Sequence, residues 1–428
     1  MSETATTQPE FLATDTPRRG GLYRRLVLDA LGRMKAGCLH LELPGGEARM
    51  IGTPSAEISA QIRVLDPAFF QKCVLFGDVG FGESYVDGDW ETDSIERVIA
   101  WAILNVESSP AMSGSKTRKV ALNLLKHYNR ALHLLRPNSI ATARRNIAEH
   151  YDLGNDFYRL WLDPTMTYSS ALFTAPGQTL EAAQIAKYDA LCRQLRLQPT
   201  DHVLEIGSGW GGFACHAVQR YGCRVTTVTI SDEQFKYARE RFAREGIADR
   251  VEILLADYRT ITGCFDKVAS IEMMEALGDR YLETYFAKIH AVLKSGGLAG
   301  LQYITVPDSR HAELKRGIDW IQKHIFPGSL LLSVGRVNMA LQRTGDLFLH
   351  HLEDLGASYA KTLHAWWETF NSRADDVRAL GFDDRFIRKW NYYLQYCEAA
   401  FAMRNISVVQ ATYTRPNNRS LHVTFLKP

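Results

Sequence analysis

The sequence predicts an α/β protein with a Rossmann-like, doubly wound parallel sheet, and two features indicate this fold. The first is an apolar strand, residues 203–206, that leads directly into a glycine-rich loop and then into a helix at 213–218. The second is the regular alternation of strand-like and helix-like segments that continues to residue 306. A helix between two strands allows them to lie parallel, and ligands of such sheets bind at the carboxyl ends of the strands.

The loop after the first strand has the spacing G-x-G-x-x-G at Gly207, Gly209 and Gly212. Glycine permits a tight turn and a close approach of the backbone to a ligand. The helix that follows presents unpaired N–H groups at its N-terminus, where a polar ligand can bind. The loop therefore predicts a nucleotide-like cofactor, and a purely structural strand–turn–helix is the alternative.

The end of the second strand, residues 223–230, distinguishes between two cofactors. A nicotinamide enzyme would have a ribose-binding acid there, about twenty residues after the glycines. This strand ends instead in Thr229, Ser231 and Gln234. Glu205, two residues before the first glycine, is suited to the cationic amino group of S-adenosylmethionine (SAM). SAM is therefore the expected cofactor, and a nicotinamide oxidoreductase is disfavoured.

The remaining elements follow from hydrophobic periodicity. A helix over 179–195 precedes the first strand, and its apolar positions are Leu180, Ala183, Ile185, Tyr188 and Leu191. The sheet continues with strands at 251–255, 265–272 and 298–306 and helices at 232–245 and 281–293. The chain then has a helical insertion at 307–352, helices at 362–371 and 383–403, and an antiparallel hairpin of strands 407–413 and 421–425. At or near the carboxyl ends of the strands lie Gly209, Thr229, Asp257, Glu272, Glu275 and Gln302.

Composition limits the function classes. The chain has 428 residues, enough for two domains, and its 46% hydrophobic and 23% charged residues are ordinary for a soluble globular protein. The net charge of +2 is too balanced to indicate nucleic-acid binding. The seven cysteines are scattered without a C-x-x-C pair, so we expect reduced thiols in a cytoplasm, with no disulfide framework and no metal site. No apolar run approaches the length of a membrane-spanning helix.

Four segments are expected along the chain. Residues 1–20 are polar and are predicted to be a disordered tail. Residues 21–107 form a small mixed α/β domain, accessory or lipid-contacting, with a turn-rich stretch at 77–83. Residues 108–145 form a linker and a basic amphipathic helix, which either sits on an anionic membrane or docks on the catalytic domain. Residues 146–428 form the catalytic domain, whose aromatic segment before the first strand can cover a bound cofactor. The elements predicted in the small domain are helices at 26–31 and 69–74 and strands at 38–43 and 62–64.

These motifs together resemble the cyclopropane-fatty-acyl-phospholipid synthase family, which includes the mycolic-acid cyclopropane synthases. The resemblance runs from about Leu26 to the C-terminus. Its most informative parts are residues 150–158, Tyr168 with Ser169, 205–212, 229–231 with Gln234, 257–259, Glu275, 325–328, and Tyr359 with Thr362 and Leu363. Each part is weak alone, but the combination is specific.

The resemblance implies a class I SAM-dependent methyltransferase fold that acts on the double bond of an unsaturated acyl chain of a phospholipid. Methyl transfer leaves a carbocation, and loss of a proton gives a cyclopropane or a methylene-bearing chain, which a partner reductase could convert to a methyl branch. The residues expected to bind SAM are Tyr168, Ser169, Glu205, Gly207, Ser208, Gly209, Gly211, Thr229, Ile230, Gln234, Asp257 and Tyr258. We expect a cytoplasmic protein, peripherally associated with the inner face of the membrane. No nucleic-acid partner is expected, and a homodimer is left open.

The sequence departs from the family where the base is bound. In familiar members that base is a bicarbonate ion, held by a glutamate, a histidine, a tyrosine and backbone groups. This sequence keeps Glu275 and Tyr359, but Gln302 replaces the histidine and Ser170 replaces a cysteine. Glu272 stands where a glycine is usual. Our hypothesis is that the Glu272 carboxylate is the base and that bicarbonate is not required. Two carboxylates near one pocket should raise the pKa of one of them. The alternative is that Glu272 points to solvent or pairs with a basic neighbour.

The expected catalytic set is therefore Glu272, Glu275, Tyr359, Gln302, Ser170 and Cys397. Cys397 is included because it matches a cysteine that is catalytic in the family, although a thiol on an aromatic helix is more often inert. Two rival functions remain. One is a methyltransferase for another acceptor, such as a small amine, and the other is a lipid-binding protein that lost activity through the changes at Ser170 and Gln302.

Overall fold

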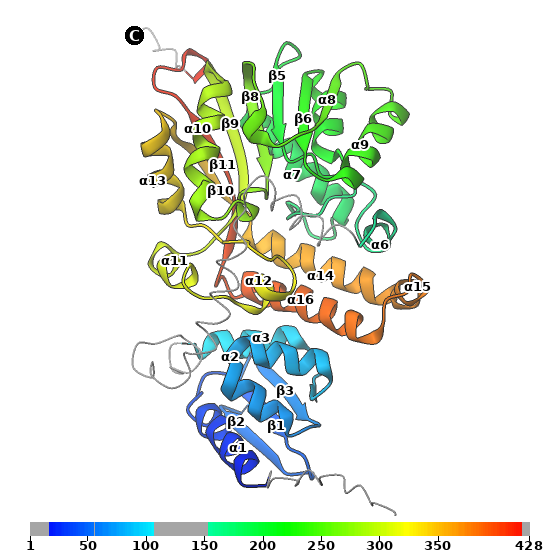
Figure 1. The fold of residues 1–428 in the computed structure, drawn as a ribbon, viewed down its shortest axis with the longest axis vertical. Helices are drawn as coiled ribbons and strands as arrows, with labels where there is room; N and C mark the ends of the chain where they lie inside the picture. Colours follow the sequence, from blue (N-terminus) through cyan, green and yellow to red (C-terminus); the bar gives the residue numbers. More distant parts are fainter. Residues whose placement is uncertain (1–16, 55, 107–152, 422–428) are drawn as a thin grey trace, which may run out of the picture.

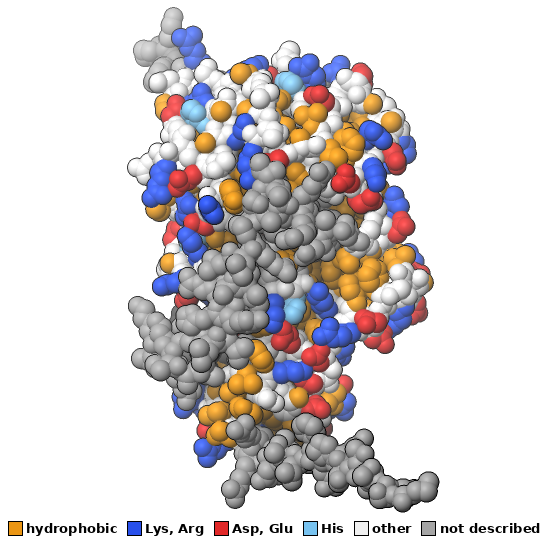
Figure 2. Space-filling model, in the orientation of Figure 1, with side chains coloured by type: hydrophobic (Ala, Val, Ile, Leu, Met, Phe, Trp, Pro, Cys, Tyr) orange, Lys and Arg blue, Asp and Glu red, His pale blue; other side chains and the backbone are white. Residues whose placement is uncertain are grey.

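The computed structural model describes residues 17–54, 56–106 and 153–421. A small N-terminal domain and a larger α/β domain are stacked along the long axis of the molecule (Figure 1). The linker and basic helix expected at 108–145, and the start of the aromatic segment at 150–152, lie outside the described residues. In the part of the chain that the structure describes, no helix is long and apolar enough to cross a bilayer. Basic and acidic side chains are interspersed on the face drawn in Figure 2, in keeping with the net charge of +2.

The small domain combines a mixed sheet with helices. Its elements are α1 (Pro17–Leu31), β1 (Cys38–Glu42), β2 (Ala48–Gly52), β3 (Ser59–Val64), α2 (Ala68–Asp87), β4 (Trp90–Glu91) and α3 (Ile95–Leu104). The strand order is β2-β1-β3-β4, and β1 pairs antiparallel with β2 and parallel with β3. Leu39 and Leu41 on β1, and Ile62 and Val64 on β3, are buried with exposed residues between them, so one face of the sheet forms the core of the domain.

Three details of this domain differ from the expectation. Helix α1 begins at Pro17, inside the segment expected to be a tail. The turn-rich stretch 77–83 lies within α2, which kinks at Gly77 (φ 60°, ψ −131°) and continues to Asp87. Glycine allows this kink because it adopts positive φ without steric strain. Strand β2 and helix α3 had no counterpart among the predicted elements.

The larger domain begins with α6 (Asn155–Arg159) and α7 (Leu180–Gln194). The α/β part consists of β5 (His202–Ile206), α8 (Gly212–Tyr221), β6 (Arg224–Thr229), α9 (Asp232–Arg244), β7 (Val251–Leu255), η2 (Tyr258–Thr260), β8 (Phe265–Ile271), η3 (Met274–Ala276), η4 (Asp279–Tyr281), α10 (Leu282–Val292) and β9 (Leu293–Thr305). The remainder consists of α11 (Asp308–Leu314), α12 (Trp320–His324), α13 (Val334–Thr344), β10 (Phe348–Asp354), α14 (Gly356–Ser372), α15 (Ala374–Ala379), α16 (Asp384–Ala402), β11 (Ser407–Thr414) and η5 (Arg419–Leu421).

The strands of this domain form one sheet with the order β10-β11-β9-β8-β5-β6-β7. The pairs from β9 to β7 are parallel, and β11 and β10 add two antiparallel pairs at one side. The strand order reverses at β5, because β6 and β7 lie on one side of it and β8 and β9 on the other. The glycine loop follows β5 at this switch point, where ligands of such sheets bind. The predicted fold class is confirmed.

The first strand of the predicted C-terminal hairpin is present as β11, and its second strand, at 421–425, lies outside the described residues apart from Leu421. Strand β11 lies between β9 and β10 and pairs antiparallel with both, which was not predicted. Strand β10 in turn comes from the end of the insertion at 307–352 that was expected to be helical. The sequence places a turn at Asn418, and its side chain donates hydrogen bonds to Thr414 Oγ1 and to the Gly297 carbonyl.

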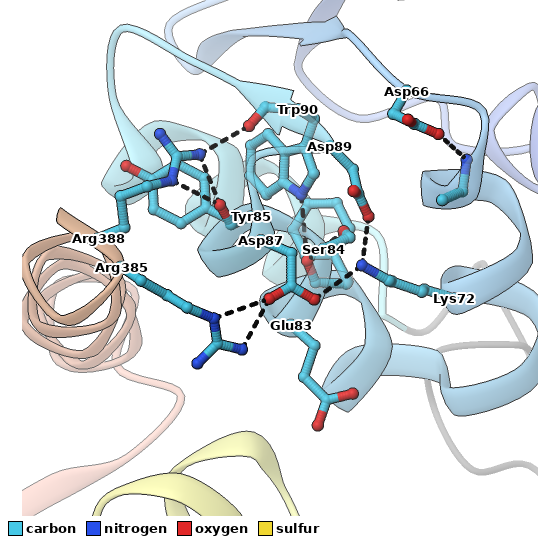
Figure 3. Close-up of polar contacts among 12 residues, drawn as sticks. Asp66, Lys72, Glu83, Ser84, Tyr85, Asp87, Asp89, Trp90, Arg385 and Arg388 are labelled. Carbon is cyan, nitrogen blue, oxygen red and sulfur yellow. Dashed lines mark hydrogen bonds and ion pairs between the residues drawn. The ribbon is translucent and has the colours of Figure 1, made fainter. Parts of the chain in front are cut away.

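Helices α14 and α16 pack against each other and lie between the large sheet and the small domain (Figure 1). Helix α16 also contacts α2 and α3. At this contact Arg388 donates hydrogen bonds to the carbonyl oxygens of Tyr85 and Trp90, and its guanidinium carbon lies 4.1 Å from the centre of the Tyr85 ring (Figure 3). Arg385 pairs with Asp87 beside it. One cluster of buried hydrophobic residues includes the core of the small domain and the aromatic residues of α14 and α16, so the two domains share a core.

Candidate active site

The glycine loop after β5 has the backbone conformation that its sequence indicates. Gly207, Gly209 and Gly211 have φ angles of 95°, 49° and 85°, in the left-handed region that favours glycine. A Cβ added to Gly212 would lie 2.5 Å from the hydroxyl oxygen of Tyr188, so α8 can begin here only with a glycine. The loop therefore needs glycine for its shape as well as for the approach of a ligand.

Glu205 precedes this loop at the end of β5 and is only 3% exposed. Its Oε2 atom is buried and has no hydrogen-bond partner among the described residues. Burial raises the pKa of Glu205 to about 8. A buried acceptor without a donor is unfavourable in a folded protein, and a cationic amino group at this position would supply both the donor and the charge. The site therefore fits a ligand with a cationic amino group, as SAM has.

The expected cofactor residues on the next strand lie where β6 ends and α9 begins. Thr229 Oγ1 donates a hydrogen bond to Gln234 Oε1 (3.0 Å) and accepts one from the backbone N–H of Ser231 (3.1 Å). Ser231 caps α9 by accepting from the N–H of Gln234. Ile230 lies between Thr229 and Ser231 and is partly exposed. The strand end is therefore shaped by its own hydrogen bonds, beside the glycine loop.

Asp257 and Tyr258 follow β7 at the same edge of the sheet. Burial alone would raise the pKa of Asp257, but the guanidinium of Arg259, which binds both carboxylate oxygens, holds it below its ordinary value. Tyr258 is 8% exposed, and its hydroxyl has no hydrogen-bond partner among the described residues. Asp257 therefore stays ionised, and Tyr258 keeps a polar atom for a ligand.

The aromatic segment before α7 packs against the glycine loop. Trp210 of the loop donates from Nε1 to Asn155 Oδ1 (2.7 Å), and its ring centre lies 5.0 Å from that of Tyr158. Arg241 of α9 donates to the carbonyl oxygens of Thr165 and Trp210. The described part of this segment therefore lies against the loop where a cofactor cover was expected.

Tyr168 and Tyr359 belong to an aromatic wall between the sheet edge and α16. The Tyr168 hydroxyl shares a hydrogen bond of 2.8 Å with that of Tyr393. The ring centres of Tyr158, Trp161, Phe326 and Trp366 lie 5.3 to 6.4 Å from that of Tyr168. The Tyr359 ring lies 4.4 Å from that of Phe401. The wall joins the cofactor side of the site to the helices that face the small domain.

Glu272 lies at the centre of the site. It directly follows β8 and has a φ angle of 48°, which is strained for a residue other than glycine. Its Oε1 atom accepts hydrogen bonds from the backbone N–H of Ser170 (2.8 Å) and from Gln302 Nε2 (2.7 Å). Its Oε2 atom accepts one from the Tyr359 hydroxyl (2.9 Å). Glu272 therefore points into the site and not to solvent, and three donors from separate parts of the chain meet at its carboxylate.

Glu272 and Glu275 differ in the donors that they receive. Burial raises the pKa of Glu272, while Lys187 and the hydrogen bonds from Ser170, Gln302 and Tyr359 act against that rise. Burial and the neighbouring charge of Glu272 raise the pKa of Glu275 to about 8. The Oε2 atom of Glu275 is buried without a partner among the described residues. Glu275 therefore keeps its proton near neutral pH, and Glu272 is the better placed of the two to be ionised.

Ser170 and Gln302 both donate to Glu272, but Ser170 does so through its backbone and Gln302 through its amide nitrogen. Ser170 contributes its backbone N–H to Glu272, while its hydroxyl donates to the Ala171 carbonyl (3.0 Å). Gln302 presents its amide nitrogen to Glu272 because its Oε1 atom accepts a hydrogen bond from Gln410 Nε2 (3.0 Å). Gln410 lies opposite Gln302 in the β9–β11 register. Gln410 was missed in the sequence because this pairing joins residues far apart in the chain.

The apolar positions of α7 do not all lie on its buried face. Ile185 is 42% exposed, whereas Gln184 and Lys187 are fully buried. Lys187 lies four residues from both Ala183 and Leu191, so it falls on the buried stripe of the helix. This spacing is the signal that could have identified Lys187 as a functional candidate.

Ser169 is held by two residues of α7. Lys187 Nζ donates to Ser169 Oγ (2.7 Å), and Gln184 Nε2 donates to the Ser169 carbonyl (2.9 Å). Ser208, in the glycine loop, is 3% exposed and donates from its hydroxyl to the Gly209 carbonyl. Both serines are thus fixed within the walls of the expected cofactor site.

Cys397 lies on α16 next to the aromatic wall. Burial raises the pKa of its thiol far above neutral, so Cys397 is not a thiolate. Neither Glu272 nor Tyr359 is hydrogen-bonded to it in the described part of the chain. Across residues 17–54, 56–106 and 153–421, no group of His, Cys, Asp and Glu side chains is arranged to hold a metal ion.

The sheet order, the glycine loop at the switch point and the buried carboxylate of Glu205 define a SAM-dependent methyltransferase with the class I fold. Comparisons with known proteins agree. The family model described as mycolic acid cyclopropane synthetase matches residues 138–411. The tuberculostearic acid methyltransferase UfaA1 of Mycobacterium tuberculosis is 40% identical over 358 residues, 79% of each chain. The cyclopropane-fatty-acyl-phospholipid synthase of Escherichia coli K12 is 36% identical over 372 residues, 85% of this chain and 90% of that protein. The crystal structure of mycolic acid cyclopropane synthase CmaA1 complexed with SAH and CTAB matches with a TM-score of 0.59 at 30% identity, over 64% of this chain and 98% of that one.

The chain therefore belongs to the mycolic acid cyclopropane synthetase family. Its cofactor is SAM, as the sequence predicted.

Proposed function

We propose that this methyltransferase transfers the methyl group of SAM to a carbon of the double bond in an unsaturated acyl chain of a phospholipid. The observation that carries the proposal is the Glu272 carboxylate, held by three donors beside an aromatic wall at the cofactor edge of the sheet. The names of the relatives, a tuberculostearic acid methyltransferase and a cyclopropane-fatty-acyl-phospholipid synthase, support the choice of substrate.

The aromatic wall suits an alkene acceptor. SAM supplies an electrophilic methyl group, and the π electrons of an alkene form the new carbon–carbon bond, which leaves a cation on the other alkene carbon. The faces of Tyr168, Trp366 and Phe326 can stabilise such a cation without reacting with it. Their packing also keeps water away, because water would add to the cation.

A base must then remove a proton, and we propose that Glu272 is this base. Its carboxylate accepts hydrogen bonds from the Ser170 N–H, Gln302 and Tyr359. Gln302 and Tyr359 stand at positions that the resemblance implied for ligands of a bicarbonate ion. Glu275 holds its own proton and therefore does not compete for the proton that the cation loses. Bicarbonate is accordingly not required.

The product depends on which proton Glu272 removes. Loss from the added methyl group closes a cyclopropane ring, and loss from a neighbouring chain carbon leaves a methylene group or a shifted double bond. A methylene product would require a reductase, acting as a partner, to become a methyl branch. Because a side-chain carboxylate is attached to the backbone and a bound ion is not, family membership alone does not fix the product.

We further propose that the small domain contacts the lipid surface. Leu22 on α1 is 46% exposed, Met50 on β2 is 56% exposed, and the arginines Arg24 and Arg49 on the same two elements are joined through Glu47. Hydrophobic and basic side chains also lie together on the part of this domain seen in Figure 2. Apolar side chains beside basic ones favour a peripheral location at an anionic membrane on the cytoplasmic side.

Product analysis tests the substrate and the reaction. Purified protein is incubated with methyl-labelled SAM and vesicles of mono- or di-unsaturated phospholipid, and the acyl chains are identified by mass spectrometry with localisation of double bonds. Label in a cyclopropane, methylene or methyl-shifted chain is the expected result. SAM binding without label in any lipid would contradict the proposal and would redirect the search to another acceptor or to an inactive lipid-binding role.

A further inference from the structure

Lys187 is a fully buried cation that neither the family motifs nor the proposed chemistry uses. It is 0% exposed, and its Nζ atom donates a hydrogen bond of 2.7 Å to Ser169 Oγ. The next residue, Ser170, donates its backbone N–H to Glu272. Burying an ammonium group is unfavourable unless opposite charges or hydrogen bonds compensate for the lost water. The Tyr188 ring, 4.4 Å from Nζ, supplies part of this compensation, and carboxylates of the site face the same ammonium group.

The charges that face Lys187 are carboxylates from three separate segments. Glu205 comes from the end of β5, Asp163 from the chain after α6, and Glu272 from the end of β8. Glu205 and Asp163 each have one buried oxygen without a hydrogen-bond partner among the described residues. Glu272 is also faced by Tyr359 from α14 and Glu275 from η3.

We propose that Lys187 is a positioning residue whose buried ammonium group holds the Ser169–Ser170 turn against Glu272 and keeps the Glu272 carboxylate ionised. The expected effect on turnover rests on the proposed function, in which Glu272 is the base. The expected effect on the ionisation of Glu272 does not.

The electrostatics agree in direction with this role. Burial lowers the pKa of Lys187 to about 7, and the three carboxylates act against that fall. For Glu272, Lys187 is the strongest influence that opposes the rise caused by burial. Removing the positive charge should therefore make Glu272 bind its proton more tightly.

The test measures the ionisation of Glu272 directly in the SAM-free protein. Glutamate labelled with ¹³C at the side-chain carboxyl is incorporated, and the Glu272 resonance is assigned as the one missing from Glu272→Gln. Its titration midpoint is compared in the wild type, Lys187→Met and Lys187→Arg. Arg193→Met is the matched control, because it removes a positive charge from the exposed face of the same helix.

We expect the Glu272 midpoint to move to higher pH by about one unit in Lys187→Met. It should stay at the wild-type value in Lys187→Arg and Arg193→Met. The ascending limb of the kcat–pH profile should move in the same way in each variant. If Lys187→Met does not fold by circular dichroism, Lys187→Gln replaces it as the neutral variant.

An unchanged Glu272 midpoint in the neutral variant would overturn the inference, and so would an equal shift in Arg193→Met. The failure of the proposed function is a different result. In that case the Glu272 midpoint would still move in Lys187→Met, but Glu272→Gln would remain active and the kcat–pH profile would not follow the midpoint.

Discussion

Replacement of Glu272 by glutamine separates the role of its carboxylate from its place in the structure. The amide oxygen of Gln can still accept from the Ser170 N–H and from Gln302 Nε2, which lie 2.8 and 2.7 Å from the present Oε1 atom. The amide nitrogen can donate to the Tyr359 hydroxyl, now 2.9 Å from Oε2. All three contacts are therefore kept, and a partly buried charge is removed. We expect Glu272→Gln to fold with wild-type stability or higher and to bind SAM normally.

The same substitution removes the only function that an amide cannot replace, which is proton acceptance. Loss of a general base lowers a rate by about 10² to 10⁴-fold. The assay follows the initial rate of label transfer from SAM into unsaturated phospholipid vesicles, with SAM affinity measured by calorimetry and stability by urea denaturation. Glu283→Gln is the matched control, because Glu283 lies in an exposed pair with Arg343. A Glu272→Gln enzyme with kcat within tenfold of the wild type would refute the assignment of the base.

Three further predictions follow from the contacts of the site and of the domain interface. Tyr359→Phe removes one hydrogen bond to the Glu272 carboxylate, so it should lower kcat at neutral pH by about tenfold and move the ascending limb of the kcat–pH profile to higher pH; an unchanged profile would exclude this contact from the mechanism. Glu275 has a folded-state pKa of about 8, above its unfolded value, so its contribution to stability is complete below pH 4.5 and is lost as the pH rises toward 8. Glu275→Gln should therefore be more stable than the wild type at pH 8 and lose less stability between pH 5 and 8, and equal urea midpoints at both pH values would contradict this. Arg388→Met removes the hydrogen bonds to the carbonyl oxygens of Tyr85 and Trp90 and the contact with the Tyr85 ring. Urea denaturation should therefore show a free energy of unfolding about 2 kcal/mol lower. No change would mean that the interface is held by apolar packing alone.

Patterns within short stretches of sequence predicted much of the fold. The β5 strand and its glycines specify their own geometry, because positive φ at Gly207, Gly209 and Gly211 is a local requirement. The alternation of strands and helices in turn specifies a parallel sheet. The pairing of β11 with β9 and β10 was not predicted, because no local signal reports such distant pairing.

The site was predicted only in part, because its contacts also join residues that are far apart in the chain. Glu272 was identified from its position at a strand end and from its departure from the family pattern, but its donors could not be assigned from sequence alone. Ser170 acts through its backbone, and Gln302 is oriented by Gln410 across the β9–β11 pair. Lys187 was missed because a charged residue on a helix is usually exposed, and only the phase of α7 shows that it is buried.

If Glu272 is the base, turnover does not depend on bicarbonate, and this dependence can be measured. The wild-type enzyme is assayed with labelled SAM and unsaturated phospholipid in buffer freed of carbon dioxide, and bicarbonate is then added in steps. A relative that keeps the histidine and the glycine of the bicarbonate site serves as the positive control. With Glu272 as the base, we expect full activity without bicarbonate and no change in activity when bicarbonate is added. Strong activation by bicarbonate would contradict it and would return the role of base to a bound ion.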